Sequence, residues 1–224
     1  MQLAPLFPII HTILKSAFPG CLWTGNVNSR EIALTFDDGP HNRHTPQLLK
    51  ALDDYQIQAS FFLLGCCVER YPEITQEICD RQHWIGLHGY QHKSFIGMKS
   101  QEFKQSLEDT QKAISKASNL DQKLIRDVRP PNGIFTPKTL QLLKQWEYRP
   151  VMWSVVPEDW VRPGVSTVVS RVVDQTVNGS IIVLHDGACG GEDVAATAAK
   201  IIPLLLDKGY NFVTVDRLWQ QGRN

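Results

Sequence analysis

Two adjacent aspartates, Asp37 and Asp38, close a short apolar run in the segment TFDDGP at positions 35–40. Such carboxylates repel each other unless a positive charge or a proton donor lies near them, and a metal ion would supply that charge. Successive side chains of an extended chain point in opposite directions, so we expect the pair to divide two roles. One carboxylate would bind a metal and the other would handle protons. The alternative is a solvated Asp-Asp-Gly-Pro turn, which is ordinary loop chemistry.

Two histidines, His88 and His92, follow another apolar run at a spacing of four residues. Gly86 and Gly89 favour a loop here over a helix, but both imidazoles can reach one ion in either case. With Asp38 they would offer two nitrogens, one oxygen and an open position for water, which is the composition of catalytic zinc sites. Zinc suits this set best, and cobalt, nickel, iron or manganese are alternatives. Two unrelated histidines are the competing interpretation of the pair.

His185 follows the apolar run IIVL at positions 181–184, so a titratable group stands where a buried strand would leave the core. An imidazole placed there is a candidate general acid or a further metal ligand. The alternative is a core histidine with satisfied hydrogen bonds. We expect the remaining histidines to be structural or surface residues: His11, His41, His44 and His83.

From Glu31 onward, short apolar runs alternate with longer amphipathic segments, which predicts βα units around a mostly parallel sheet. Seven strands are expected, at 32–36, 60–64, 84–87, 124–128, 150–154, 180–184 and 211–215. Six helices are expected, at 45–55, 72–82, 100–116, 137–146, 166–177 and 193–206. The unusual polar residues all follow strands, and the carboxyl ends of parallel strands share the rim where barrels carry their active sites. The sequence therefore predicts a single-domain, distorted (β/α) barrel of about seven parallel strands.

Hydroxyl and proline residues locate several helix ends. Thr136 ahead of Pro137 predicts an N-cap, and Ser100 and Ser166 are expected to cap their helices in the same way. Pro203 lies inside the last helical run, where it removes a backbone hydrogen bond and crowds the preceding turn. We therefore expect a kink or an early break at Pro203.

The composition is that of an ordinary globular domain and excludes several classes of protein. The 224 residues are 42% hydrophobic and 21% charged, unlike disordered chains, collagens or coiled coils. Lysine plus arginine number 23 and aspartate plus glutamate 23, so no net basic field would hold nucleic acid or anionic lipid. The five cysteines show no repeated short spacing, and we expect no disulfide framework.

The segment 1–30 is expected to be an arm that packs on a domain formed by residues 31–224. No basic residue precedes its apolar start, and Pro5 and Pro8 interrupt the run, which argues against a signal peptide. No stretch approaches the roughly 18 uninterrupted apolar residues of a transmembrane helix. We therefore expect a cytoplasmic protein, with export or membrane association as the alternative.

Five motifs, in order, resemble the polysaccharide deacetylase family, the NodB-homology domain of carbohydrate esterase family 4. They are TFDDGP at 35–40, His-x-x-x-His at 88–92, Arg-x-Pro-x-Gly at 129–133, Asp-Trp at 159–160 and Leu-His-Asp at 184–186. The resemblance runs from about Glu31 to the C-terminus, and the segment at 58–65 is similar to the family's second strand. It implies a distorted barrel with fewer than eight strands and metal-dependent removal of N- or O-acetyl groups from sugars.

The resemblance also implies roles for the motif residues. Asp37 would be the general base, oriented by Arg129, and His185 the general acid, with its acidic partner in the same segment as Asp159. The metal ligands would be Asp38, His88 and His92. The residues expected to border the substrate are Pro131, Asn132, Asp159, Trp160 and Leu184. A backbone amide near Asn132 would help to hold the oxyanion.

Three positions depart from the family pattern. Gly89 stands where the family commonly has serine or threonine, which affects the order of the loop more than the identity of the ligands. Val156 stands where many members have an acid, and His185 would lack its partner if that acid were the one that tunes it. Asn132 replaces an aromatic residue, which predicts altered stacking against a sugar. These departures point to a specialised substrate or to reduced activity on common ones.

We therefore predict a metal-dependent hydrolase that removes N-acetyl or O-acetyl groups from a sugar, either within a glycan or on a lipid- or nucleotide-linked precursor. One alternative is an amidohydrolase or deformylase acting on another acylamide, such as a lipid-linked formamido sugar. Another is a non-catalytic glycan-binding barrel, although a pure binder needs neither a base nor an acid. A glycosidase fits poorly because adjacent Asp37 and Asp38 are not spaced to flank one bond. Ser154 lacks the glycine elbow of a serine nucleophile.

Overall fold

The computed structural model describes residues 7–221, and residues 1–6 and 222–224 lie outside the described part. Its strands are β1 (Glu31–Asp37), β2 (Ser60–Leu63), β3 (Trp84–Leu87), β4 (Asp127–Val128), β5 (Arg149–Pro150), β6 (Ile181–His185) and β7 (Asn211–Phe212). Its α-helices are α1 (Phe7–Ala17), α2 (His44–Asp54), α3 (Gly65–Arg70), α4 (Pro72–Asp80), α5 (Ser100–Ser118), α6 (Pro137–Gln145), α7 (Val165–Gln175), α8 (Val194–Asp207) and α9 (Val215–Gln221). Short 3₁₀ helices cover Gln122–Leu124, Pro131–Gly133, Asp159–Val161 and Gly191–Asp193.

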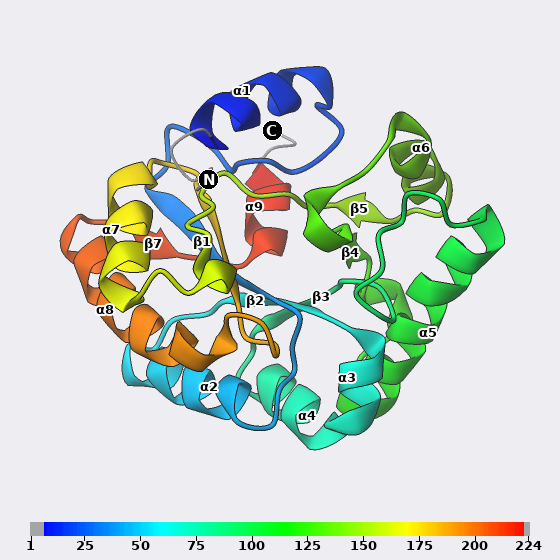
Figure 1. Cartoon of the computed structure of the whole chain (residues 1–224), viewed down its shortest axis with the longest axis horizontal. Helices are drawn as coiled ribbons and strands as arrows, with labels where there is room; N and C mark the ends of the chain where they lie inside the picture. The colour runs from blue at the N-terminus through cyan, green and yellow to red at the C-terminus, as the bar shows by residue number, and fades with distance from the viewer. Residues whose placement is uncertain (1–6, 222–224) are drawn as a thin grey trace.

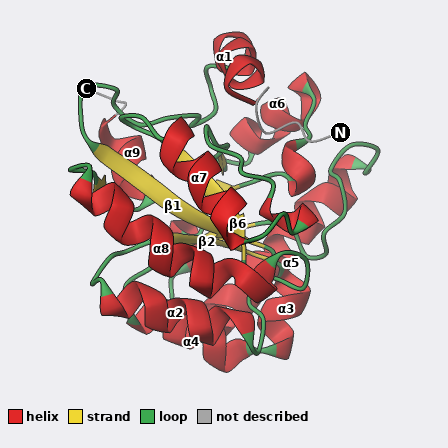
Figure 2. Ribbon diagram, turned by 60° about the vertical axis from the view of Figure 1, so that its left-hand side comes forward, coloured by secondary structure: helices red, strands yellow, loops and turns green. Residues whose placement is uncertain are grey.

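The seven strands form one parallel sheet that curves into an incomplete barrel. Their order is β5-β4-β3-β2-β1-β6, and β7 pairs with the first residues of β1. Helices surround the sheet as an outer ring, with α7, α8, α2, α4 and α5 covering much of the circumference (Figures 1 and 2). Isolated bridges between Leu22 and Val151 and between Val155 and Ile182 narrow the gap between the two edges. The predicted distorted barrel of about seven parallel strands is confirmed.

The side chains of β1 alternate between the two faces of the sheet, and this places the Asp37 carboxylate on the inner face of the barrel. Leu34 and Phe36 belong to the large core between sheet and helices, whereas Ala33 packs in a smaller cluster inside the barrel. Because side chains alternate along a strand, Thr35 and Asp37 share the inward side of Ala33. Both faces of the strand are buried, as expected for a parallel sheet covered by helices.

Most predicted elements are present, but three strands are shorter than their apolar patterns. The expected strand at 124–128 is reduced to β4, because Leu124 ends a 3₁₀ helix and its side chain is exposed. The expected strand at 150–154 is reduced to β5, and Val215 begins α9 where a strand was expected. Apolar residues here pack without taking part in a hydrogen-bonded ladder.

The expected break at Pro203 is wrong, because α8 continues through it to Asp207. A proline at this position cannot donate to the carbonyl four residues earlier, which belongs to Ala199. The Tyr55 hydroxyl donates to that carbonyl at 3.1 Å. A side chain from another part of the chain therefore satisfies the acceptor that the proline leaves open.

One of the three expected helix caps is present. Thr136 accepts the Thr139 amide at 3.1 Å, and Thr139 closes a capping box with the Thr136 backbone. The caps expected at Ser100 and Ser166 are wrong, because the N-cap residues of α5 and α7 are Lys99 and Gly164. The serines instead lie within the first turn of each helix.

The N-terminal segment contains a helix that the sequence did not predict. Helix α1 contacts the barrel through Leu14, which packs against a small cluster that includes Trp23 and Met152. Ile9 and Ile13 on the same helix are exposed, at 62% and 63%. Within residues 7–221, no helix is long and apolar enough to cross a bilayer.

An ion-pair network ties together the amino ends of three strands, opposite the rim that carries the motifs. Arg149 on β5 binds the fully buried Asp127 on β4 through two hydrogen bonds of 2.6 and 2.7 Å. The Trp84 indole donates to the same carboxylate at 2.6 Å, and Asp216 binds Arg149 at 2.9 Å. Bidentate arginine–carboxylate pairs are strong and directional.

We expect Arg149→Met to lower the free energy of unfolding by about 3–5 kcal/mol, because it leaves the Asp127 carboxylate buried without its cation. Urea unfolding followed by circular dichroism measures this loss. The double variant Asp127→Asn/Arg149→Met removes both charges and should recover part of the lost stability. A loss below about 1 kcal/mol in the single variant would show that water replaces the arginine.

Candidate active site

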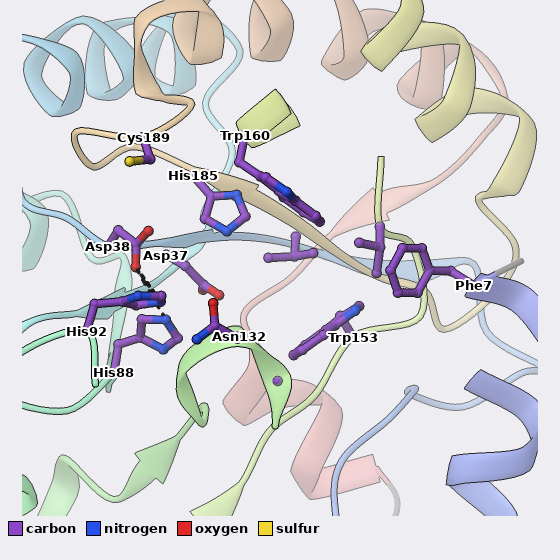
Figure 3. A pocket seen from close by; sticks show the side chains of 13 residues that line it. Phe7, Asp37, Asp38, His88, His92, Asn132, Trp153, Trp160, His185 and Cys189 are labelled. Atoms are coloured by element: carbon purple, nitrogen blue, oxygen red, sulfur yellow. Dashed lines mark ion pairs between the residues drawn. The ribbon is translucent and has the colours of Figure 1, made fainter. Parts of the chain in front are cut away.

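The strand ends bring the predicted polar residues together around one pocket. Asp37 ends β1 and lies opposite His185, the last residue of β6, in the register of the sheet. His88 follows β3 and Arg129 follows β4. A pocket of about 370 Å³ opens on this rim, and Figure 3 shows that Asp37, Asp38, His88, His92 and His185 all point into it.

Asp38, His88 and His92 form a compact group of potential metal ligands. The Asp38 Oδ1 atom lies 3.4 Å from the Nε2 atoms of both histidines, and the ligand atoms all lie within 4.8 Å of one another. Among the described residues, this buried oxygen has no hydrogen-bond partner. An unpartnered carboxylate oxygen facing two imidazole nitrogens fits a divalent cation.

His88 is held in the form that binds metals. Its Nδ1 lies 2.8 Å from the Arg129 carbonyl oxygen, which can only accept, so Nδ1 carries the proton and the Nε2 lone pair faces Asp38. Burial lowers the pKa of His88 to about 3, which keeps the imidazole neutral. His92 is more accessible, with 36% of its side chain exposed. The cluster thus has one fixed and one accessible histidine.

Arg129 holds Asp37 beside this cluster. Its side chain is fully buried, and Nη1 donates to Asp37 Oδ1 at 2.6 Å and to Thr35 Oγ1 at 2.8 Å. Nη2 donates to the Met152 carbonyl at 2.9 Å, and the guanidinium lies 4.0 Å from the centre of the Phe62 ring. These contacts fix the guanidinium plane, so the carboxylate of Asp37 has a defined orientation and a buried counter-charge.

His185 is bound by Asp159 on the opposite side of the pocket. Asp159 Oδ1 lies 2.8 Å from His185 Nδ1, and its Oδ2 accepts the His185 backbone amide at 2.7 Å. Burial lowers the pKa of His185, but the charge and hydrogen bond of Asp159, together with the charges of Asp37 and Asp38, outweigh burial and raise the pKa to about 9. The imidazole is therefore protonated at neutral pH, with its Nε2 side directed away from Asp159.

The departure at Val156 does not leave His185 without an acid. Asp159 supplies the carboxylate from the segment in which a partner was expected, and Val156 instead lines the pocket with a side chain that is 2% exposed. The contact between Asp159 and His185 is thus independent of position 156.

We expect Asp159→Asn to move the alkaline limb of the kcat/KM profile to lower pH. A reaction that needs protonated His185 is active below its pKa of about 9 and fails as the pH rises through that value. Without the Asp159 carboxylate, the largest cause that raises the pKa of His185 is lost while burial still lowers it, so the pKa falls below about 9. Activity at pH 7 should fall by about 10² or more.

The exposed Asp54 provides a matched control for that profile, because Asp54→Asn makes the same chemical change on α2. Its pH profile should coincide with that of the parent. An unchanged alkaline limb in Asp159→Asn would contradict the assignment of His185 as the acid that this limb reports.

Only some of the residues expected to border the substrate line the pocket. Asn132 and Trp160 line the pocket, while Asp159 lies behind His185 and Pro131 is buried. Leu184 is fully buried in the main core. Strand alternation explains the difference, because Val183 and His185 share the face of β6 toward the pocket and Leu184 points to the helices.

Six lining residues were not expected from the sequence: Phe7, Gly133, Trp153, Val156, Val183 and Cys189. The alternation of β6 could have identified Val183. Gly133 has a positive φ of 64° and lies against the Trp153 ring, which leaves no space for a side chain at position 133. Phe7 comes from α1, and no local pattern connects it to the rim.

A second buried carboxyl supports the loops around the pocket. Asp186 is fully buried and accepts the Thr45 hydroxyl at 2.5 Å, while its backbone amide donates to the Asp37 carbonyl. Its side chain lies directly against Gly39, at a distance that no Cβ could share. Burial raises the pKa of Asp186 to about 7. This residue connects the end of β6 to the loop that carries Asp38.

The remaining histidines lie outside the ligand group. His83 Nδ1 accepts the Ala59 amide at 3.2 Å, and His44 Nδ1 lies 3.0 Å from the Gly187 carbonyl. The rings of His41 and His44 stack with centroids 3.9 Å apart, and His11 packs edge-on against Trp23. All five cysteines are free thiols, as expected.

The polysaccharide deacetylase family matches this chain over residues 24–151. A peptidoglycan-N-acetylglucosamine deacetylase of Bacillus cereus is 35% identical over 198 residues, which cover 88% of this chain and 91% of the relative. A chitooligosaccharide deacetylase of Azorhizobium caulinodans is 32% identical over 195 residues, with 82% and 91% coverage.

The fold gives the same result. The crystal structure of a peptidoglycan N-acetylglucosamine deacetylase superposes with a TM-score of 0.86 at 30% sequence identity, over 90% of this chain and 94% of that one. The fold that the sequence motifs predicted is thus shared with this solved structure over most of both chains. By sequence and by fold, the chain belongs to the polysaccharide deacetylase family.

Proposed function

We propose that this protein is a metal-dependent hydrolase that removes the N-acetyl group from an N-acetylated hexosamine within a glycan. One observation carries the proposal: two carboxylate–cation pairs, Asp37 with Arg129 and Asp159 with His185, flank one group of three potential metal ligands. One pair presents a base and the other an acid, which is the combination that amide hydrolysis needs. The named relatives, which deacetylate amino sugars in peptidoglycan or chitooligosaccharides, support this substrate class.

Asp38, His88 and His92 would hold the metal, and zinc suits two imidazoles and a carboxylate. When bound, a divalent metal polarises the acyl carbonyl and makes water a better nucleophile. The accessible His92 and the open pocket leave room for substrate beside the three ligands.

Asp37 accepts the proton of the attacking water, because Arg129 holds its carboxylate at the floor of the pocket. The water oxygen forms a bond to the acyl carbon, and the carbonyl oxygen gains negative charge. The Gly133 and Ile134 amides donate to carbonyls of their own turn, so we assign the Asn132 amide as the backbone donor to this oxyanion.

His185 donates a proton to the leaving nitrogen from its Nε2 side, because Nδ1 is engaged by Asp159. The carbon–nitrogen bond breaks, and the products are acetate and a free amine on the sugar. Trp160 packs edge-on against His185 with ring centroids 5.2 Å apart, which limits rotation of the imidazole.

The test is a panel of chitooligosaccharides, peptidoglycan fragments, O-acetylated xylan and N-formylated sugars, assayed with the zinc-loaded protein for released acetate or formate and for new amines. We expect acetate and amine in equal amounts from the N-acetylated glycans. Formate release from N-formylated sugars in place of acetate would favour the deformylase alternative. Stoichiometric metal without any acyl release would contradict a hydrolase.

A further inference from the structure

The pocket has a second, hydrophobic end that an acetyl group does not fill. Its described lining there consists of Phe7, Trp153, Val156, Trp160 and Val183. Figure 3 shows Phe7 and Trp153 on the side of the pocket away from His88 and His92, with Trp160 above them. The same continuous cavity of about 370 Å³ therefore joins a polar reaction centre to a hydrophobic wall.

This wall is built rigidly into the end of the barrel. Val156 and Val183 are 2% and 3% exposed, and they lie beside the bridge between Val155 and Ile182 that narrows the barrel gap. The Val183 amide donates to the Val155 carbonyl at 3.1 Å, which fixes the two valines relative to each other. A pre-formed wall binds an apolar group with little cost in ordering.

Helix α1 supplies the outer part of the wall. Phe7 is the first residue of the helix. Leu14, seven residues later, anchors the helix against the cluster of Trp23 and Met152. A second, smaller pocket of about 40 Å³, lined in part by Ile10 and Trp153, lies against the helix and shares Phe7 and Val156 with the first. Helix α1 and the segment that follows β5 therefore both line the hydrophobic end.

A sugar ring does not match the buried part of this end, which Val156 and Val183 line. Its hydroxyl groups lose free energy when they leave water without hydrogen-bond partners, and aliphatic side chains supply none. The one apolar part of an N-acylated amino sugar is its acyl chain, and acetyl contributes a single methyl group. Three aromatic rings and two valines offer more contact than one methyl can use, so the wall fits a longer alkyl chain.

We propose that this pocket is an acyl subsite that accepts N-acyl groups longer than acetyl, with the alkyl chain lying along Val183, Val156 and Phe7. The inference rests on the proposed function and extends its substrate class to N-acylated amino sugars with short to medium chains. The chemistry is unchanged: water adds to the acyl carbon, the carbon–nitrogen bond breaks, the nitrogen receives the proton, and a longer carboxylate is released.

The first test measures binding without catalysis. Straight-chain alkyl hydroxamates, which bind metal ions through their two oxygens, are titrated from two to eight carbons against the full-length zinc-loaded protein by calorimetry. We expect the affinity to rise by about fourfold per methylene until the wall ends, because each buried methylene contributes a constant increment. A flat or falling series would overturn the proposal.

Variants of the wall residues test where the alkyl chain of the ligand binds. Phe7→Ala should end the rise at a shorter chain, and Val156→Trp should fill the subsite and flatten the series. Ile13→Ala is the matched control, because Ile13 is exposed on the same helix and lies outside the pocket lining. Equal profiles for Phe7→Ala, Val156→Trp and the parent would contradict the assigned wall.

Hydrolysis separates this inference from the proposed function. The ratio of kcat/KM for N-butyryl and N-hexanoyl over N-acetyl chitooligosaccharides should exceed one in the parent and fall in Val156→Trp. Hydrolysis of acetyl substrates alone, with a flat hydroxamate series, would overturn the subsite and leave the deacetylase standing. A rising hydroxamate series without hydrolysis of any acyl sugar would support the subsite and overturn the proposed function.

Discussion

Replacement of His88 by alanine is expected to abolish stoichiometric metal binding and to lower kcat/KM by about 10³ or more. The buried Nε2 of His88 and the Oδ1 of Asp38 face each other at 3.4 Å, so removal of one leaves a carboxylate and a single, more exposed imidazole. A metal contributes several kcal/mol to the stabilisation of an acyl-transfer transition state, and that contribution is lost with it. Zinc content by mass spectrometry and initial rates on chitooligosaccharides measure the two effects.

His92→Ala tests the same metal site without a change in the buried core, where His88→Ala could unfold the protein. His92 is 36% exposed, so its removal should preserve the melting temperature while it lowers metal occupancy. His41→Ala is the control that keeps full zinc occupancy, because His41 lies outside the ligand group. Full occupancy in both His88→Ala and His92→Ala would place the metal elsewhere.

Asp37→Asn is expected to retain zinc and to lower kcat by about 10² to 10⁴, the usual contribution of a general base. The amide oxygen can still accept the Arg129 hydrogen bond, so the geometry of the pocket should persist. The variant leaves Arg129 buried without a counter-charge, and we also expect a loss of about 3–5 kcal/mol in stability. Rates at saturating substrate are therefore compared well below the melting temperature of the variant.

A variant that loses stability but keeps the parental kcat would show that Asp37 pairs with Arg129 for structural reasons alone. Asp127→Asn, at the opposite end of the barrel, is the useful comparison. It also removes a buried carboxylate from an arginine pair, and it lies outside the pocket lining. Its kcat should therefore stay near that of the parent while its stability falls.

The position of the motif residues could be predicted from the sequence because it follows from strand direction. Asp37, His88, Arg129 and His185 each come at or just after the end of a parallel strand, and parallel strands place their carboxyl ends on one rim. The hydrogen bonds between those residues, in contrast, do not follow from strand direction. The hydrogen bond from Arg129 to Asp37 joins residues 92 positions apart, and no local pattern specifies it; only the family resemblance predicted this pair.

The substrate side was predicted less well, for two physical reasons. Leu184 was expected at the substrate as part of the Leu-His-Asp motif, but neighbours on a strand face opposite ways and Val183 lies on the pocket side. Phe7 reaches the pocket through the packing of α1, which depends on tertiary contacts of Leu14. The motif therefore gave the wrong position for Leu184, and Phe7 could not be predicted because its position depends on long-range packing.

Pro203 and Asp159 show how tertiary structure settles questions that local rules leave open. The rule that proline breaks a helix fails at Pro203, because the Tyr55 hydroxyl satisfies the Ala199 carbonyl. The departure at Val156 left open which acid serves His185, and the turn around Asp159 places both carboxylate oxygens on that histidine. In both cases the side chain that makes the contact, Tyr55 or Asp159, is far in sequence from the residue it contacts.

The most direct test of the proposed function compares the zinc-loaded parent with zinc-loaded Asp37→Asn on one N-acetylated chitooligosaccharide. Released acetate and new free amine are measured together at matched metal content. We predict equal amounts of acetate and amine from the parent, suppression by a chelator, recovery on return of zinc, and a rate lower by at least about 10² in the variant. Equal acetate release by both proteins, or release that persists in the chelator, would contradict metal-dependent deacetylation at this site.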